Sequence, residues 1–175
     1  MRSQSGFTLV ELLVASAIGV IVMTGLTSVV LTTWRAGTIA TGRIEASAQI
    51  RNFQFDAYDD FALSSLPDTS GCGTPPWTCP IHLYGTQAAI VNGSLVLDPT
   101  YQATYTWDPT SHTLDRAVGT NQMVHPMVHA ATNVTAFSWY EDTSTLHPTV
   151  VVTLTVTVQS YAETQIMRFY PRVNP

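Results

Sequence analysis

The sequence predicts an α+β protein in which a long N-terminal α-helix, membrane-spanning in its first half, packs on an antiparallel β-sheet domain. Three observations predict this class. Residues 12–33 carry no charged side chain, and residues 43–66 continue with apolar residues at helical spacing. Residues 81–170 hold short alternating apolar and polar runs that are typical of β-strands.

The composition limits the classes of function. The 175 residues suffice for one domain with an appendage. Charged residues make up 11% of the chain, all seven basic residues are arginines, and the formal net charge is −5. Binding of a nucleic-acid backbone needs a basic face, so this charge argues against such binding by the domain as a whole.

The uncharged segment is long enough to cross a lipid bilayer. Its 22 residues form a helix of about 33 Å, close to the ~30 Å of a bilayer core. Glu11 is the only charge between Arg2 and Arg35, and a charge at the centre of a membrane helix costs about 2.5–3.5 kcal/mol. A secretory signal cleaved at "ASA" (residues 15–17) and a plain single-pass anchor both leave Glu11 unexplained.

The stretch "GFTLVELLVA", residues 6–15, resembles the processing signature of type IV prepilins and type II secretion pseudopilins. The resemblance implies cleavage after Gly6 by a prepilin peptidase and methylation of the new N-terminal residue, Phe7. It also supplies a partner for Glu11, namely the Phe7 amine of the same or a neighbouring subunit. Such a pair matters in an apolar filament core, because the alternative there is an unpaired buried charge.

Under this pilin-like interpretation the chain has four segments. Residues 1–6 are the leader peptide, and residues 7–34 are the transmembrane and filament-core helix. Residues 35–66 are the amphipathic continuation of that helix, and residues 67–175 form the globular β domain. Gly37 and Gly42 mark a place where the helix can bend, and Pro67 predicts that it ends near Leu66.

The amphipathic continuation is expected to pack its apolar face against the β domain. The acidic residues on its polar side are interpreted as a solvated face rather than a calcium site, because the Asp-x-Asp-x-Asp-Gly loop pattern is absent. The predicted apolar stripe consists of Ile44, Ala48, Phe55, Tyr58 and Ala62, widened by Ile50, Phe53, Ala57 and Phe61, and the predicted polar face of Arg51, Asn52, Asp56, Asp59 and Asp60.

The remaining residues predict a loop over 66–80 and then about six to eight strands in one antiparallel sheet. Asn92-Gly93 between two apolar runs predicts a hairpin. In "YQATYTW" the residues Tyr101, Ala103, Tyr105 and Trp107 share one face. Further strands are expected over residues 113–118, 133–140 and 149–159, and over about 163–170. In the third of these, the inward residues are Val150, Val152, Leu154, Val156 and Val158.

Cys72 and Cys79 can be free thiols, part of a metal site or a disulfide, and for an exported domain the disulfide is favoured. Between them Trp77 is either an exposed contact residue or a buried staple of the loop.

The histidines offer a weaker candidate site. His125 and His129 share a face if they lie on a strand, and His112 or His147 can add a third zinc ligand. Ordinary loop histidines are the preferred interpretation. We therefore expect no metal, no cofactor and no catalytic residues.

The order of the strand motifs is also similar to J-type minor pseudopilins and W-type minor type IV pilins, over about residues 101–170. This resemblance implies a low-copy subunit at or near a filament tip, assembled with other major and minor pilins or pseudopilins above an inner-membrane platform. The expected location is the bacterial inner membrane, with a periplasmic globular domain, and then the pilus or pseudopilus. Two alternatives remain: a tip recognition module that binds DNA, a surface or secreted cargo, and a membrane-tethered or secreted enzyme.

Overall fold

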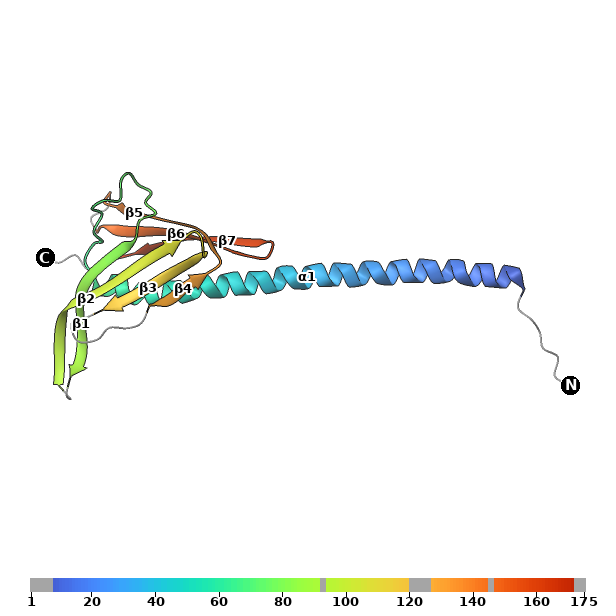
Figure 1. The fold of residues 1–175 in the computed structure, drawn as a ribbon, viewed down its shortest axis with the longest axis horizontal. Coiled ribbons are helices and arrows are strands. Elements are labelled where there is room, and N and C mark those ends of the chain that lie inside the picture. Colours follow the sequence, from blue (N-terminus) through green and yellow to red (C-terminus); the bar gives the residue numbers. More distant parts are fainter. Residues whose placement is uncertain (1–7, 92–93, 120–126, 145–146, 172–175) are drawn as a thin grey trace. The chain divides into compact units, whose positions relative to one another are not determined.

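The computed structural model describes residues 8–91, 94–119, 127–144 and 147–171 (Figure 1). Over these residues the chain forms one helix and seven strands. It divides into two compact units, residues 1–41 and residues 42–175. The helix α1 (Leu9–Leu63) contributes to both units, and the strands pair antiparallel, which confirms the predicted α+β class.

The first unit contains the N-terminal part of α1, whose side chains are exposed throughout residues 9–37. Several hydroxyl groups on it bond back to the helix itself. Ser16 and Thr24 donate to carbonyls three residues earlier, at 2.9 and 2.8 Å, and Thr27 donates to one four residues earlier at 2.8 Å. These polar groups are therefore satisfied within the helix, as a lipid environment requires. By length and composition, α1 can cross a membrane.

The helix continues through Gly37 and Gly42 without interruption and ends at Leu63, slightly before the predicted Leu66. It stops there because Ser64 leaves the helix to form a β-bridge with Gly85 of strand β1 (Ile81–Val91). A Cβ atom on Gly85 would lie 2.2 Å from the carbonyl oxygen of Leu63. Only glycine permits this close approach of strand and helix end.

In the second unit α1 turns one face inward, and this face differs from the predicted one. The widening set is buried as expected: Ile50, Phe53, Ala57 and Phe61. The main predicted stripe is wrong, because Ile44, Phe55 and Tyr58 are 72%, 76% and 68% exposed, and Ala48 and Ala62 are exposed as well. The two apolar stripes lie on opposite sides of the helix, and the β domain covers only one of them.

The first sheet has the strand order β1-β2-β3-β4, with β2 (Ser94–Asp108), β3 (Thr113–Gly119) and β4 (Val128–Thr132). The predicted hairpin is confirmed by the antiparallel pairing of β1 and β2, in which Val91 lies opposite Ser94. The predicted face of β2 is also confirmed, since Tyr101, Ala103 and Tyr105 are buried. Strand β4 was not predicted from the sequence.

The second sheet has the order β5-β6-β7, with β5 (Val134–Asp142), β6 (Thr149–Val158) and β7 (Tyr161–Phe169). All five residues predicted to face inward from β6 are buried. The outward positions of β6 are largely threonines, and one of them, Thr155, forms a hydrogen bond with Thr164 of β7 at 2.9 Å. This alternation made β6 the clearest strand in the sequence.

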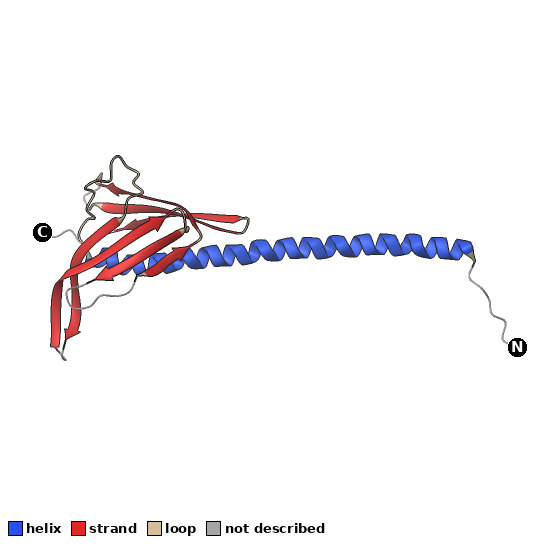
Figure 2. Ribbon diagram, in the orientation of Figure 1, coloured by secondary structure: helices blue, strands red, loops and turns tan. Residues whose placement is uncertain are grey.

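The strands form two sheets rather than the single sheet expected. The chain passes from β4 to β5 through Asn133, which has a φ of 59°, a left-handed conformation that asparagine tolerates. Hydrogen bonds then tie the sheets together: Val134 N donates to the His112 carbonyl at 2.8 Å and Thr157 N to the Asn133 carbonyl at 2.9 Å. The strands gather around the C-terminal part of α1 (Figure 2), and one core serves both sheets.

Aromatic rings join α1 to both sheets. The Phe53 ring lies 5.5 Å from Tyr105 of β2 and 6.2 Å from Phe169 of β7, edge to face in each case. The Phe61 ring stacks on Phe169 at 4.5 Å. Such pairs contribute about 0.5–1.5 kcal/mol each beyond their area burial. The helix is therefore the element that holds the two sheets in one core.

A buried ion pair lies among these rings, and it overturns the prediction that Asp60 is solvated. Asp60 is 1% exposed, and its two carboxylate oxygens each accept a hydrogen bond from the Arg116 guanidinium of β3 at 2.7 Å. Tyr105 donates a third bond at 2.5 Å, and Tyr101 donates a fourth. The carboxylate is fully paired, which is the condition under which a buried charge is tolerated.

In this cluster the charged state of Arg116 and the protonated state of the two tyrosines are both favoured by the contacts with Asp60. Burial, together with the charge of Asp60, raises the pKa of Tyr105 and of Tyr101, so both phenols remain proton donors. The hydrogen bonds to Asp60 raise the pKa of Arg116, so its charge persists. The cluster thus ties the last turns of α1 to β2 and β3.

We predict that Asp60→Ala lowers the free energy of unfolding by about 3 kcal/mol, because it leaves the partly buried Arg116 charge without a partner. The neighbouring Asp59 is exposed, and Asp59→Ala is expected to change that free energy by less than about 0.5 kcal/mol. Urea titration of the detergent-solubilised chain, followed by tryptophan fluorescence, measures both. Equal losses in the two variants would contradict the structural role of Asp60.

Candidate functional site

The motif that resembles a prepilin processing site lies at the start of α1. Gly6 and Phe7, the predicted cleavage and methylation residues, lie outside the described residues. The described chain begins at Thr8, and Glu11 stands in the first turn of the helix. The structure therefore places Glu11 but does not test the predicted pairing of Glu11 with the Phe7 amine.

Glu11 forms a capping box with Thr8. The backbone N–H and the hydroxyl of Thr8 both donate to the Glu11 carboxylate at 3.0 Å, and Glu11 N donates in return to the Thr8 hydroxyl at 3.4 Å. This reciprocal arrangement satisfies donors at a helix N-terminus that otherwise lack partners. A carboxylate there also interacts favourably with the helix dipole. Glu11 therefore has a local structural role besides the proposed intersubunit one.

This capping role was not predicted above, although the sequence carries a signal for it. Thr-x-x-Glu directly before an apolar run is the pattern of a capping box. The geometry also bears on the predicted ion pair. The amine exposed by cleavage after Gly6 would belong to Phe7, the residue that immediately precedes Thr8. The capping box holds the carboxylate at the backbone N–H and hydroxyl of Thr8.

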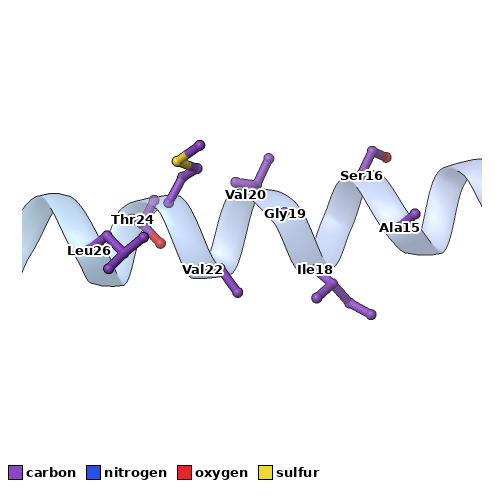
Figure 3. Close-up of a pocket in the computed structure, with 9 residues that line it drawn as sticks. Ala15, Ser16, Ile18, Gly19, Val20, Val22, Thr24 and Leu26 are labelled. Carbon is purple, nitrogen blue, oxygen red and sulfur yellow. The ribbon is translucent and has the colours of Figure 1, made fainter.

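Beyond Glu11 the apolar part of α1 carries a shallow hollow around Gly19 (Figure 3). A Cβ atom built on Gly19 would meet no atom within 4 Å in this chain. Small residues of this kind allow a second helix to approach closely within a membrane. The residues that line the hollow are Ala15, Ser16, Ile18, Gly19, Val20, Val22, Met23, Thr24 and Leu26.

In the second unit, Cys72 and Cys79 form a disulfide with a Cα–Cα distance of 5.5 Å, the alternative favoured from the sequence. Trp77, inside the closed loop, is half-buried and forms a two-way backbone bridge with Trp139 of β5, at 2.7 and 2.8 Å. The two indole rings are 4.8 Å apart, and Trp139 Nε1 donates to the Cys79 carbonyl at 2.9 Å. Trp77 therefore staples the loop to β5.

The histidines do not converge within the described residues. His129 bonds through Nδ1 to the Asp115 carboxylate at 2.5 Å, whereas His112 lies in the turn between β2 and β3 with a φ of 55°. His125 lies outside the described residues. Within the part of the chain that the structure describes, no three His, Cys, Asp or Glu residues are grouped so that they could hold a metal ion.

Comparison with known proteins gives a match for the N-terminal residues of the chain. The family described as the prokaryotic N-terminal methylation motif matches residues 1–27. No curated protein and no solved structure matches the chain. The motif supports a precursor of the type IV pilin and pseudopilin class, a class of structural rather than catalytic proteins. It implies processing by prepilin peptidase and assembly with other pilins.

The match ends before the second unit begins, so it carries no information about the branch of that class. The likeness to J-type pseudopilins and W-type pilins rests on the strand motifs alone. The single apolar N-terminal helix and the motif together fit a pilin anchored in the inner membrane.

We predict that Cys72 and Cys79 are oxidised in the protein isolated from its membrane. Iodoacetamide should then add nothing to the unreduced, unfolded chain and two groups after reduction, as read by intact mass. In a Trp77→Ala variant the loop loses its contacts with Trp139, so a low concentration of reductant should open the disulfide faster than in the unaltered chain. Alkylation of both cysteines without reduction would contradict the disulfide.

Proposed function

We propose that this chain is a minor pilin-like subunit of a type II secretion or type IV pilus system. Prepilin peptidase cleaves it after Gly6 and methylates Phe7. The helix over residues 7–34 anchors it in the inner membrane as a single pass, with the globular domain on the periplasmic side. The subunit then joins the filament at or near its tip and helps to start assembly. The methylation motif at residues 1–27 is the observation that carries this proposal.

The apolar part of α1 supports the proposal in two ways. Its exposed surface is apolar, and the hydroxyls of Ser16, Thr24 and Thr27 are bonded to its own carbonyls, so it suits lipid before assembly. The hollow around Gly19 lets another apolar helix pack closely after assembly. One helix can thus serve first as an anchor and then as part of a filament core.

Glu11 is the residue on which assembly depends in this proposal. Its carboxylate caps α1 through Thr8 and pairs with the Phe7 amine of the same or a neighbouring subunit. The capping box reduces the freedom of the side chain, so less entropy is lost when the amine arrives. Because the surroundings are apolar, the pair is strongly favoured over two separate charges. This pairing sets the axial position of one subunit against the next.

The placement at the tip rests on the resemblance of the strand motifs over about residues 101–170 to minor pseudopilins and minor pilins. Partners in the proposed assembly are major and minor pilin-like subunits and the inner-membrane platform. Recognition of DNA, a surface or cargo by the globular domain remains the alternative role for the same subunit.

We predict that the mature chain begins with N-methylated phenylalanine at position 7. Mass spectrometry of the N-terminal peptide from purified membranes measures this directly. A mature chain that begins at Ile18 or Gly19 would point to an ordinary signal peptidase and contradict the proposal. So would a working filament whose subunits retain residues 1–6.

We predict that Glu11→Ala and Glu11→Gln both insert into the membrane but enter filaments more than tenfold less often, because an unpaired charge in an apolar core costs about 2.5–3.5 kcal/mol. The Gln variant keeps an acceptor for Thr8 N and so preserves the cap. The ratio of subunit in sheared filaments to subunit in membranes is the readout. Normal assembly of the Gln variant would show that capping, and not the ion pair, is what Glu11 contributes.

A further inference from the structure

Other segments of the chain contact most of the strands that lie at an edge of the two sheets. On β4 the Thr132 amide donates to a glutamine of α1 at 3.0 Å. On β5 Trp139 exchanges two backbone hydrogen bonds with Trp77, and on β7 Glu163 accepts a hydrogen bond from Ser47 of α1 at 2.7 Å. Such contacts matter, because an open edge presents unpaired N–H and C=O groups that can bond to another chain.

The edge of β1 is covered over only the first part of its length. The carbonyl of His82 accepts a hydrogen bond from Asp68 N at 3.3 Å, and that of Tyr84 accepts one from Ser65 N at 2.9 Å. The cover ends at Gly85, which bridges to the residue that follows α1. Within the part of the chain that the structure describes, no segment pairs with this edge of β1 over residues 87–91.

The uncovered part of β1 belongs to a two-stranded ribbon. Residues 87–91 pair with residues 94–98 of β2, whereas the pairing of β2 with β3 begins only at Gln102. Figure 1 shows these ends of β1 and β2 extending past the other strands of their sheet. We call residues 87–91 and 94–98 the distal ribbon. Two strands alone are marginally stable, so the distal ribbon lacks the support that the rest of the sheet has.

The bonding groups on the open edge can be assigned to residues. Alternate residues of an antiparallel strand bond to opposite sides, and the His82 and Tyr84 carbonyls face away from β2. The register shift in the middle of β1 places its extra residue in β2, so the alternation along β1 continues. The N–H and C=O groups of Ala88 and Ile90 therefore face the open edge, whereas those of the residue between them face β2.

The two edges of the distal ribbon differ in sequence. On β2 the ribbon ends with Asp98, which is followed by Pro99, and a charge and a proline both discourage the addition of a strand. On β1, residues 86–91 contain neither. Ile90 and Val91 also have a high preference for strands. β1 is therefore the edge that admits a further strand.

We propose that the β1 edge of the distal ribbon binds an extended segment of a different protein, which adds to the sheet as a strand. Backbone hydrogen bonds to Ala88 and Ile90 hold this segment. The segment is itself uncharged, because residues 86–97 contain no charged residue that could pair with a charge brought against them. That the partner differs from this chain rests on the proposed function, in which the subunit is present in few copies.

Other classes of partner fit this edge less well. Lipid offers no hydrogen-bonding groups in its apolar region, so it would leave the N–H and C=O groups of β1 unpaired. Nucleic acid is bound through basic residues that neutralise its phosphates, and residues 86–97 contain none. An extended polypeptide supplies alternating donors and acceptors at the spacing of a strand.

Hydrogen exchange of the detergent-solubilised chain, read by NMR, tests whether the edge is open. The amides of Ala88 and Ile90 should exchange roughly tenfold or more faster than those of Ala89 and Val91, which bond to β2. Equal rates at the four positions would overturn the inference, because the edge would then be covered or the ribbon unformed.

Photo-cross-linking of the full-length chain in its native membranes tests the partner. Benzoylphenylalanine at Gln87, beside the open edge, should give an adduct with a different protein. Mass spectrometry should place the attachment in an uncharged segment of that protein. The control position is Ile166 of β7, which is 62% exposed and lies on an edge strand that α1 contacts. It should not give this adduct.

Paired substitutions at one residue separate backbone bonding from apolar contact. Ile90→Pro removes an N–H that faces the open edge and should lower the yield of the adduct roughly fivefold or more. Ile90→Thr keeps this N–H and the preference for a strand, so the yield should stay within about twofold. Ala88→Pro and Ala88→Thr should repeat the result. Slow exchange at the Ala89 amide in the proline variants is the check that the ribbon remains formed.

Three results of the cross-linking would overturn the inference: no adduct from Gln87, an adduct with a second copy of this chain, or equal yields from the proline and threonine variants. The N-terminus of the same sample is read by mass spectrometry. A methylated Phe7 with any of these results removes the added strand but keeps the proposed function, whereas an unprocessed chain removes the proposed function.

Discussion

The burial of one carboxylate determines how the globular unit is organised. Asp60 can lie in the core only because Arg116, Tyr101 and Tyr105 together satisfy both of its oxygens. Since these partners come from β2 and β3, the ion pair determines which side of α1 faces the sheets. The rotation of the helix about its axis follows, with Phe53 and Phe61 turned inward and Phe55 and Tyr58 turned outward. The exposure of Phe55 and Tyr58 is thus a consequence of the burial of Asp60.

A second carboxylate, Glu11, has a different role, because it caps the N-terminal end of the same helix. It lies in the first turn, where unpaired N–H groups and the helix dipole favour an acid, and Thr8 holds it there. In water this cap is a modest local contribution. In the function that we propose, the same carboxylate also pairs with the Phe7 amine. The two acids illustrate one rule. A charge that is buried or lies in apolar surroundings needs a well-placed partner, because an unpaired charge there is costly.

Much of the fold could be predicted from the sequence, because it depends on local patterns. The apolar run over residues 12–33, the hairpin around Asn92-Gly93 and the alternation in β6 all depend on neighbours within a few residues. The capping box was equally local and was overlooked. β4 was missed because its five residues are too few to show a period. The division into two sheets was missed because it arises at Asn133, whose left-handed φ has no reliable signal in the sequence.

By itself the sequence determined the N-terminal motif, the membrane-length segment, the class of fold and the inner faces of the strands. Only the tertiary structure decided which of the two apolar stripes of α1 is buried, because both follow helical spacing equally well. The tertiary structure also shows that Asp60, which was predicted to lie on the solvated face, is buried in the core. The physical reason is distance along the chain, because Arg116, the partner of Asp60, lies 56 residues away. The periodicity of the residues around Asp60 carries no information about a guanidinium on a distant strand.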